Sequence, residues 1–305
     1  MLGATVLAVI FASLALCLTY SPDHGNINMK SPYAIFFVTT VLIALIVPPL
    51  FVVGFKDLKI TRTRRDLIFS RVASMLLLIG TFAYTLTDMV YMTSGEFEVW
   101  RFFRALVAIF VIIFGLLDFL PSKTKVSTTV KNFVNGCVPV YTALSILALY
   151  FNPTYVPEYF KILYVVAYSI LTLFFLYDFK WRLIKTNAKA YTAISAMTFV
   201  FSAIISLTSI VGFICKNDYF AQSEITVSLF EMIFVLILGI YALSKVIAIK
   251  KTVEYVIVET HKRNEEKKRK EEKRQAEENA KFEAMKAQLE EATAKEENND
   301  QNGEK

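Results

Sequence analysis

Four ionisable residues lie inside apolar stretches of the chain, and they are the best placed to do chemistry. Asp88 lies near the end of one apolar run, Arg101 and Arg104 open the next, and Glu231 lies inside a third. Ionisable side chains in a membrane span usually face a partner, a ligand or water. Because a short loop joins the first two runs, we expect Asp88 to form an ion pair with the arginines.

Glu231 is the most isolated of these charges. It lies about five residues, or roughly 8 Å, from the middle of its apolar segment, and no basic residue lies within a helical turn of it. It must find a partner on another helix, bind a cation or stay protonated, because a low-dielectric environment disfavours its charged form. Convergence with Asp88, Arg101 and Arg104 would make an outward-opening polar pocket that binds a ligand. The alternative is a buried structural network.

The elements that hold these charges are predicted to be membrane helices. The chain has 305 residues, of which 55% are hydrophobic and 20% charged, against about 45–50% apolar and a quarter charged in soluble domains. In lipid, long apolar runs satisfy their backbone hydrogen bonds as helices. We therefore predict an all-α polytopic fold with eight transmembrane helices, at 2–20, 33–54, 67–92, 99–120, 132–152, 159–179, 190–214 and 225–249.

The loops alternate in charge, which predicts the orientation. The 55–66 loop has five basic residues and the 121–131 and 180–189 loops are also basic, whereas the loops between them are neutral or acidic. The positive-inside rule then places both termini in the cytoplasm of a plasma-membrane protein. Segment 2–20 lacks a basic start and a clean cleavage site, so we expect it to be retained. A seven-span form with an outside N-terminus would satisfy the later loops equally well.

Further polar residues have simpler interpretations. Asp118 and Asp178 end two spans close to basic residues, which predicts local pairing at the cytoplasmic interface, and Lys245 is expected to reach the cytoplasmic surface. Gly136 and Pro139 should loosen the 132–152 helix, and such breaks sometimes mark a transport site. A hydroxyl stripe on one face of the 190–214 helix predicts close helix packing or a wet cavity. Its members are Ser195, Thr198, Ser202, Ser206 and Ser209.

The charged tail is predicted to be a separate part of the chain. We divide the sequence into a membrane domain at 1–249, a cytoplasmic helix at 250–297 and a disordered end at 298–305. The tail from Lys250 has 14 basic and 15 acidic residues, with supportive i,i+4 pairs and a short, weak coiled-coil seam. The tail could bind a protein partner, a second copy of the chain or anionic membrane lipid. The alternative is a solvated helix without a binding role.

The sequence shows no motif for a metal, a cofactor or nucleic acid. The three cysteines, Cys17, Cys137 and Cys215, have no metal-ligand spacing, and no P-loop, GxSxG or HExxH pattern occurs. The net charge of +6 comes from basic residues in alternate loops, which is not a nucleic-acid signal. We expect no metal, cofactor or nucleic-acid partner.

The stretch LIGTFAYTLTDMVYM (residues 78–92), in a chain of eight spans with both ends inside, resembles the lysoplasmalogenase family of membrane hydrolases. The resemblance implies an acid ending span three, a Lys-Pro pair opening span two and a second acid late in span seven. Asp88 matches the first acid. Lys30, two residues before Pro32, resembles the Lys-Pro pair and joins the candidate ligand-binding residues.

The sequence departs from that family pattern in two places. Thr87 stands where the family has glycine, and Thr208-Ser209 stands where the second acid is expected. General acid and base roles at one water use two carboxyl groups. Vinyl-ether hydrolysis would therefore need Asp88 and Glu231 as its catalytic residues, with Glu231 as the substitute acid.

These observations support three hypotheses about function, and whether the protein is an enzyme stays open. The tail and the incomplete catalytic pattern favour a non-enzymatic sensor or scaffold, with an outward polar pocket and a partner-binding cytoplasmic helix. A lysoplasmalogenase-like lipid hydrolase requires Asp88 and Glu231 to lie close enough to share a water. A small-solute or ion transporter requires a broken helix at mid-membrane.

Overall fold

The computed structural model places the chain in two compact units, Met1–Thr252 and Val253–Lys305. It describes residues 38, 42, 46, 68–94, 98–120, 126–151, 158–184, 188–214, 229–249, 265–266 and 268–279. All of the regular structure in these residues is helical.

Six described helices of the first unit are long and apolar enough to cross a membrane. At 1.5 Å per residue even the 21-residue helices reach about 31 Å, the thickness of a bilayer's hydrocarbon core. The chain is therefore an all-α integral membrane protein. The helices are α3 (Ile68–Ser94), α4 (Val99–Phe119), α5 (Thr128–Phe151), α6 (Glu158–Ile184), α7 (Ala188–Ile214) and Leu229–Ile249, which we name the central helix.

The predicted segments from 67 onward are confirmed to within about five residues. Segment 2–20 lies outside the described residues, as does 33–54 apart from three isolated positions. The count of eight spans and the orientation of the termini therefore stay predictions. The largest difference is at α6, which continues to Ile184. Lys180 and Arg182, assigned to a loop by the sequence, lie in its last turns, where Arg182 pairs with Asp178 one turn earlier.

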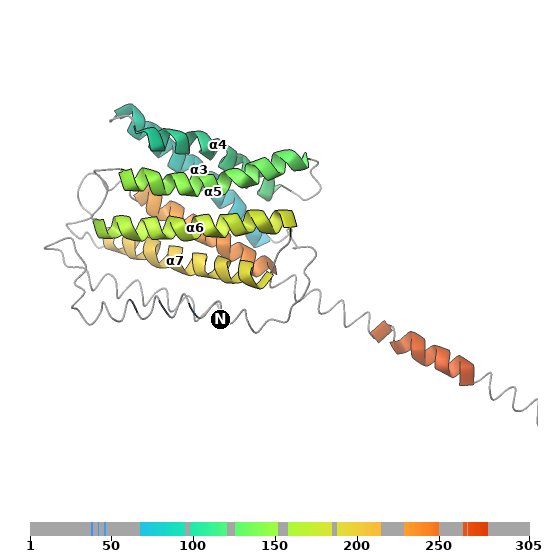
Figure 1. Cartoon of the computed structure of the whole chain (residues 1–305). Helices are drawn as coiled ribbons and strands as arrows, with labels where there is room; N and C mark the ends of the chain where they lie inside the picture. Colours follow the sequence, from blue (N-terminus) through green and yellow to red (C-terminus); the bar gives the residue numbers. More distant parts are fainter. Residues whose placement is uncertain are drawn as a thin grey trace, which may run out of the picture. The chain divides into compact units, whose positions relative to one another are not determined.

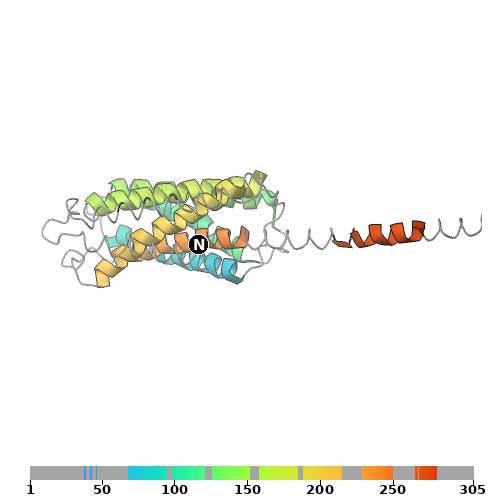
Figure 2. The same cartoon turned by 90° about the horizontal axis from the view of Figure 1, so that it is seen from below.

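Helices that follow one another in sequence pack together: α3 on α4, α4 on α5, α5 on α6 and α6 on α7 (Figure 1). The central helix contacts all five. Its Phe234 stacks on Tyr84 of α3 with ring centroids 4.8 Å apart, and its Tyr241 contacts Phe114 of α4 at 5.9 Å. The other contacts are Tyr141–Phe234 from α5, Phe175–Tyr241 from α6 and Ser202–Gly239 from α7. The view in Figure 2 shows the central helix in orange between α3 and α7.

The hydroxyl stripe on α7 is buried along its whole length. A Cβ placed on Gly239 of the central helix would lie 2.8 Å from the Cβ of Ser202, so a serine opposite a glycine lets these two helices approach closely. At the far end of the stripe, Ser209 accepts a hydrogen bond of 3.1 Å from Tyr164 of α6. At Ser202 and Ser209 the stripe therefore serves helix packing, one of its two interpretations.

Helix α5 continues through Pro139 without a break. The Thr142 hydroxyl donates to the Pro139 carbonyl at 3.0 Å and accepts a bond of 2.9 Å from Thr172 of α6. These contacts join the turn that follows Pro139 to α6. The broken mid-membrane helix that the transporter hypothesis requires is not found at Gly136 or Pro139.

The second unit contains a solvent-exposed helix. Residues 265–266 and 268–279 are helical and exposed, and Arg274 pairs with Glu278 at 3.1 Å. The rest of the predicted cytoplasmic helix lies outside the described residues, and so does most of the weak coiled-coil seam. The coiled coil therefore stays a prediction.

Candidate functional site

Asp88 and Arg104 form the buried ion pair that the sequence predicted. The Arg104 Nε donates to Asp88 Oδ2 at 2.9 Å, and its Nη2 donates to Oδ1 at 2.5 Å. The residues are only 1% and 3% exposed. Antiparallel helices joined by a short loop bring the end of α3 beside the start of α4, which explains the contact. This two-bond geometry is the strong form of an arginine–carboxylate pair.

Arg101 is buried beside this pair but has its own acid. Its Nε donates to Glu98 at 2.6 Å, and its guanidinium lies 3.7 Å from the centre of the Tyr91 ring. Its Nη1 is buried and makes no hydrogen bond to any residue that the structure describes. Lys30, the other predicted ligand-binding residue, lies outside the described residues.

Glu231 projects from the central helix into the same region. It is 2% exposed, and it interacts electrostatically with Arg104, with Asp88 and with the Tyr84 side chain. Tyr84 also lies beneath the Arg104 guanidinium, whose carbon is 4.6 Å from the ring centre. The structure therefore brings together the intramembrane charges that the sequence singled out, on α3, α4 and the central helix. Arg101 also lies within electrostatic range of Glu231.

Two tyrosines missed by the sequence analysis complete this region. Tyr141 of α5 and Tyr168 of α6 are 1% and 0% exposed, and both lie within electrostatic range of Arg104. Their hydroxyl oxygens make no hydrogen bond to the described residues. We name the whole group the Asp88 cluster; it consists of Tyr84, Asp88, Arg104, Tyr141, Tyr168 and Glu231.

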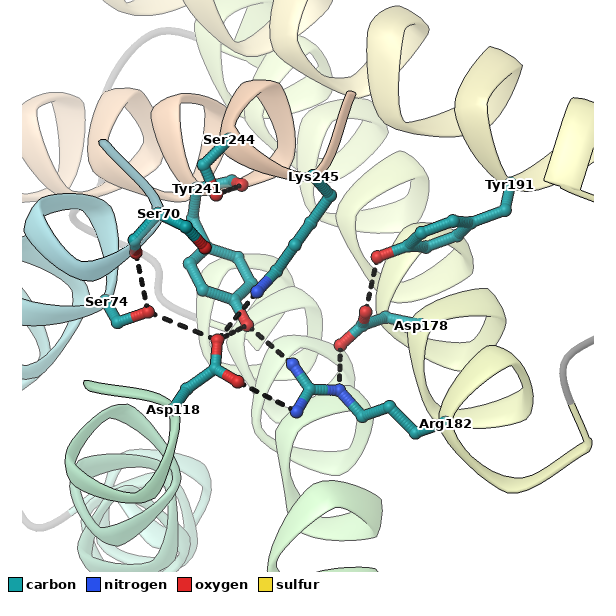
Figure 3. Close-up of polar contacts among 9 residues, drawn as sticks. All are labelled: Ser70, Ser74, Asp118, Asp178, Arg182, Tyr191, Tyr241, Ser244 and Lys245. Atoms are coloured by element: carbon teal, nitrogen blue, oxygen red, sulfur yellow. Dashed lines mark hydrogen bonds and ion pairs between the residues drawn. The ribbon is translucent and has the colours of Figure 1, made fainter. Parts of the chain in front are cut away.

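A second polar group lies further along the same helices, around Asp118 at the end of α4 (Figure 3). Its Oδ2 accepts hydrogen bonds from Lys245 at 2.6 Å, Tyr241 at 2.8 Å and Ser74 at 3.1 Å. Its Oδ1 accepts a bond from Arg182 at 3.0 Å. One carboxylate thus joins α3, α4, α6 and the central helix.

Arg182 links this carboxylate to a second one. Its Nε donates to Asp178 at 2.7 Å and its Nη2 donates to Tyr241 at 2.9 Å, while the Tyr191 hydroxyl of α7 donates to Asp178. We name the group the Asp118 cluster; it consists of Ser74, Asp118, Asp178, Arg182, Tyr191, Tyr241 and Lys245. None of its buried side-chain polar atoms lacks a hydrogen bond.

The predictions for these acids were partly right. The local pairing of Asp178 with Arg182 is confirmed. Local pairing of Asp118 is wrong, because its cations come from α6 and the central helix. Lys245 does not extend to the surface: its side chain is 11% exposed and bonds to Asp118. A buried carboxylate attracts a cation more strongly than solvent does when further hydrogen bonds complete its shell.

The described residues contain no group of three or more His, Cys, Asp or Glu side chains arranged to hold a metal ion. Cys137 is a half-buried free thiol, and the other two cysteines lie outside the described residues. No protein-family model, curated protein or solved structure matches the chain. The geometry of the two clusters is therefore what bears on function.

Proposed function

We propose that this chain is a non-enzymatic membrane sensor or scaffold that binds a polar ligand at the Asp88 cluster and a protein partner through its tail. The observation that carries the proposal is the presence of buried polar atoms without hydrogen bonds to described residues on Tyr141, Tyr168 and Arg101. Native proteins rarely leave such atoms without a partner, and an unmet group points to water or a ligand. Tyr141 and Tyr168 lie within electrostatic range of Arg104, and Arg101 and Arg104 are both buried.

The state of Asp88 supports binding over catalysis. Both of its oxygens accept hydrogen bonds from Arg104, so neither oxygen is free to contact a reacting group without breaking that pair. A general acid or base must exchange its proton with the reacting group. Asp88 therefore suits a structural and orienting role at the edge of a ligand site.

The lysoplasmalogenase-like hydrolase is the second candidate, and one observation favours it. Asp88 and Glu231 come within electrostatic range of each other, so both carboxyl groups belong to the same buried region. In this case Glu231 would exchange the proton and Asp88 would position Arg104. The resemblance of residues 78–92 to that family points the same way.

The predicted orientation gives the two ends of the molecule different roles. With both termini in the cytoplasm, the Asp88 cluster lies toward the outside and the Asp118 cluster toward the inside. The tail then continues from the central helix into the cytoplasm. Its described residues are helical and exposed, which leaves their side chains available to a protein partner, a second copy of the chain or anionic lipid headgroups.

Sided thiol labelling tests the binding site. Glu231→Cys is introduced after Cys17, Cys137 and Cys215 have been replaced by alanine. A membrane-impermeant cationic thiosulfonate is then applied to right-side-out and inverted vesicles, with the cysteine-free protein as control. We expect labelling from the outside only. Labelling from the inside alone, or from neither side, would contradict an outward-facing site.

A turnover assay separates the two candidates. Purified protein is incubated with vesicles that contain phosphatidylcholine, phosphatidylethanolamine and vinyl-ether lysophospholipid, and products are measured by mass spectrometry. We expect no product above the level of protein-free vesicles. Product that disappears in both Glu231→Gln and Asp88→Asn would establish the hydrolase instead.

A further inference from the structure

Three buried hydroxyl groups in the bundle interior make no hydrogen bond to any described residue. They belong to Tyr141 of α5, Tyr168 of α6 and Ser206 of α7, and each residue is at most 1% exposed. Buried hydroxyls almost always have a partner, because leaving one unpaired costs the desolvation of the group without compensation. Three on neighbouring helices call for a common explanation.

The packing of α6 against α7 brings two of them to one level. Tyr164 donates to Ser209 at 3.1 Å, which fixes the register of these antiparallel helices. Tyr168 lies one turn further along α6, and Ser206 lies one turn earlier on α7. Side chains one turn apart share a helix face, so the two hydroxyls lie on the facing surfaces about one turn from the Tyr164–Ser209 bond.

The third hydroxyl joins this pair through Tyr168. Tyr141 and Tyr168 lie within electrostatic range of each other and of Arg104, and Tyr168 also interacts with the side chains of Tyr84 and Ser145. Each hydroxyl can donate one hydrogen bond and accept two. A small molecule among these groups would meet several donors and acceptors, which is the setting that buried water occupies.

We propose that Tyr141, Tyr168 and Ser206 form a water-binding site that extends the Asp88 cluster inward between α5, α6 and α7. Ordered water there bridges the three hydroxyls and connects them to the charged groups around Arg104. The inference deepens the proposed function, since it identifies what occupies the inner side of the ligand site. A polar ligand bound at the cluster would form hydrogen bonds with this water instead of contacting an unhydrated surface.

The sign of a stability change tests the proposal. Tyr141→Phe, Tyr168→Phe and Ser206→Ala each remove one hydroxyl and little else. In a dry interior each change removes an unpaired polar group and raises the melting temperature of the purified protein. In a hydrated interior each change strips a partner from the bridging water, and we expect a fall of about 2–4 °C. Tyr164→Phe is the matched control, because its hydroxyl has a protein partner and its loss lowers stability either way.

A rise or no change in the melting temperature of Tyr168→Phe overturns the proposal. If that variant fails to fold, radiolytic hydroxyl-radical labelling of the unmodified protein decides, because radicals form from water beside the side chain that they oxidise. Oxidation of Tyr168 above that of Tyr241 supports the site, and equal or lower oxidation overturns it. Failure of the proposed function is distinguishable, since an internal water needs no open path to the outer surface and survives a negative thiol-labelling result at Glu231→Cys.

Discussion

The Asp88 and Asp118 clusters are built from similar kinds of residue and share four helices, yet they differ in how completely they are hydrogen-bonded. Four helices each carry one member of both groups 14 residues apart, just under four turns or about 21 Å. The pairs are Ser74 and Asp88, Arg104 and Asp118, Tyr168 and Arg182, and Glu231 and Lys245. Residues separated by nearly four whole turns lie on the same face of a helix, so both members of each pair point toward the bundle interior. Each of the four helices therefore contributes at least one residue to the Asp88 cluster and at least one to the Asp118 cluster.

The difference lies in what the tyrosines do. In the Asp118 cluster, Tyr241 and Tyr191 donate to carboxylates that arginine and lysine also hold. In the Asp88 cluster, Arg104 takes both oxygens of Asp88, and Tyr141 and Tyr168 keep hydroxyls without a described partner. A complete network fixes one arrangement of helices, whereas an incomplete one can accept hydrogen bonds from a ligand. We infer that stability and binding are divided between the two ends.

The largest effect should follow the loss of Asp118. Asp118→Ala removes a carboxylate that binds Arg182, Lys245 and Tyr241. The buried cations Arg182 and Lys245 then lose this negatively charged partner. Breaking a buried pair in this way typically costs about 3–5 kcal/mol. Unfolding of the purified protein in mixed micelles measures the change, with the exposed Glu278→Ala as control. A loss below about 1 kcal/mol would show that the network does not hold the helices together.

The Asp88–Arg104 pair should respond differently to double replacement. Asp88→Ala alone leaves Arg104 buried and should cost about 3 kcal/mol. The double variant Asp88→Leu/Arg104→Leu should recover most of that loss, because these two residues mainly satisfy each other. Paired replacement of Asp118 and Arg182 should not recover stability, because Lys245 and Asp178 would still lose partners. Equal recovery in both clusters would contradict the comparison.

Removal of a single tyrosine hydroxyl should lower stability by less than loss of an ion pair, and by more in the Asp118 cluster than in the Asp88 cluster. Tyr241→Phe loses bonds to Asp118 and Arg182 and should cost about 2 kcal/mol, because bonds to charged groups are the stronger ones. Tyr168→Phe loses a bond to bridging water alone and should cost about 1 kcal/mol or less. Thermal unfolding of both variants in the same nanodiscs makes the comparison. A greater loss of stability in Tyr168→Phe than in Tyr241→Phe would contradict the assignment of stability to the Asp118 cluster and binding to the Asp88 cluster.

The smallest effect is expected in the tail. Arg274 and Glu278 pair at the surface with side chains 80% and 62% exposed. Arg274→Ala should change stability by less than about 0.5 kcal/mol. Deletion of residues 265–305 should leave the melting temperature of the membrane unit unchanged, because these residues belong to the second compact unit. A large fall in that temperature would show that the tail supports the bundle.

The fold was largely predictable because lipid imposes a simple rule. A segment that spans the membrane must be helical and consist mostly of apolar residues, so segment length and hydropathy locate the described helices directly. The Asp88–Arg104 contact was predictable for a related reason: a short loop between antiparallel helices brings the two neighbouring ends together. Burial of Glu231 followed from its depth in an apolar run.

The Asp118 cluster was not predictable in the same way. Arg182 and Lys245 lie 64 and 127 positions from Asp118, so their convergence depends on how α4, α6 and the central helix pack together. Arg182 was assigned to a loop because charged residues usually mark the end of a span. Its i,i+4 spacing from Asp178 was the available sign that the helix continues. Tyr141 and Tyr168 gave no local sign among the 15 tyrosines of the chain.

A paired cysteine experiment tests the division between the two ends most directly. Ser145 and Ser244 are both buried, and each hydroxyl donates to a tyrosine carbonyl of its own helix, that of Tyr141 or Tyr241. Ser145 interacts with Tyr168 of the Asp88 cluster, and Ser244 lies beside the Asp118 cluster in Figure 3. We measure the reaction of Ser145→Cys and Ser244→Cys with a small neutral thiol reagent in membranes. We predict rapid reaction at position 145 and almost none at position 244. Equal rates, or faster reaction at 244, would contradict it.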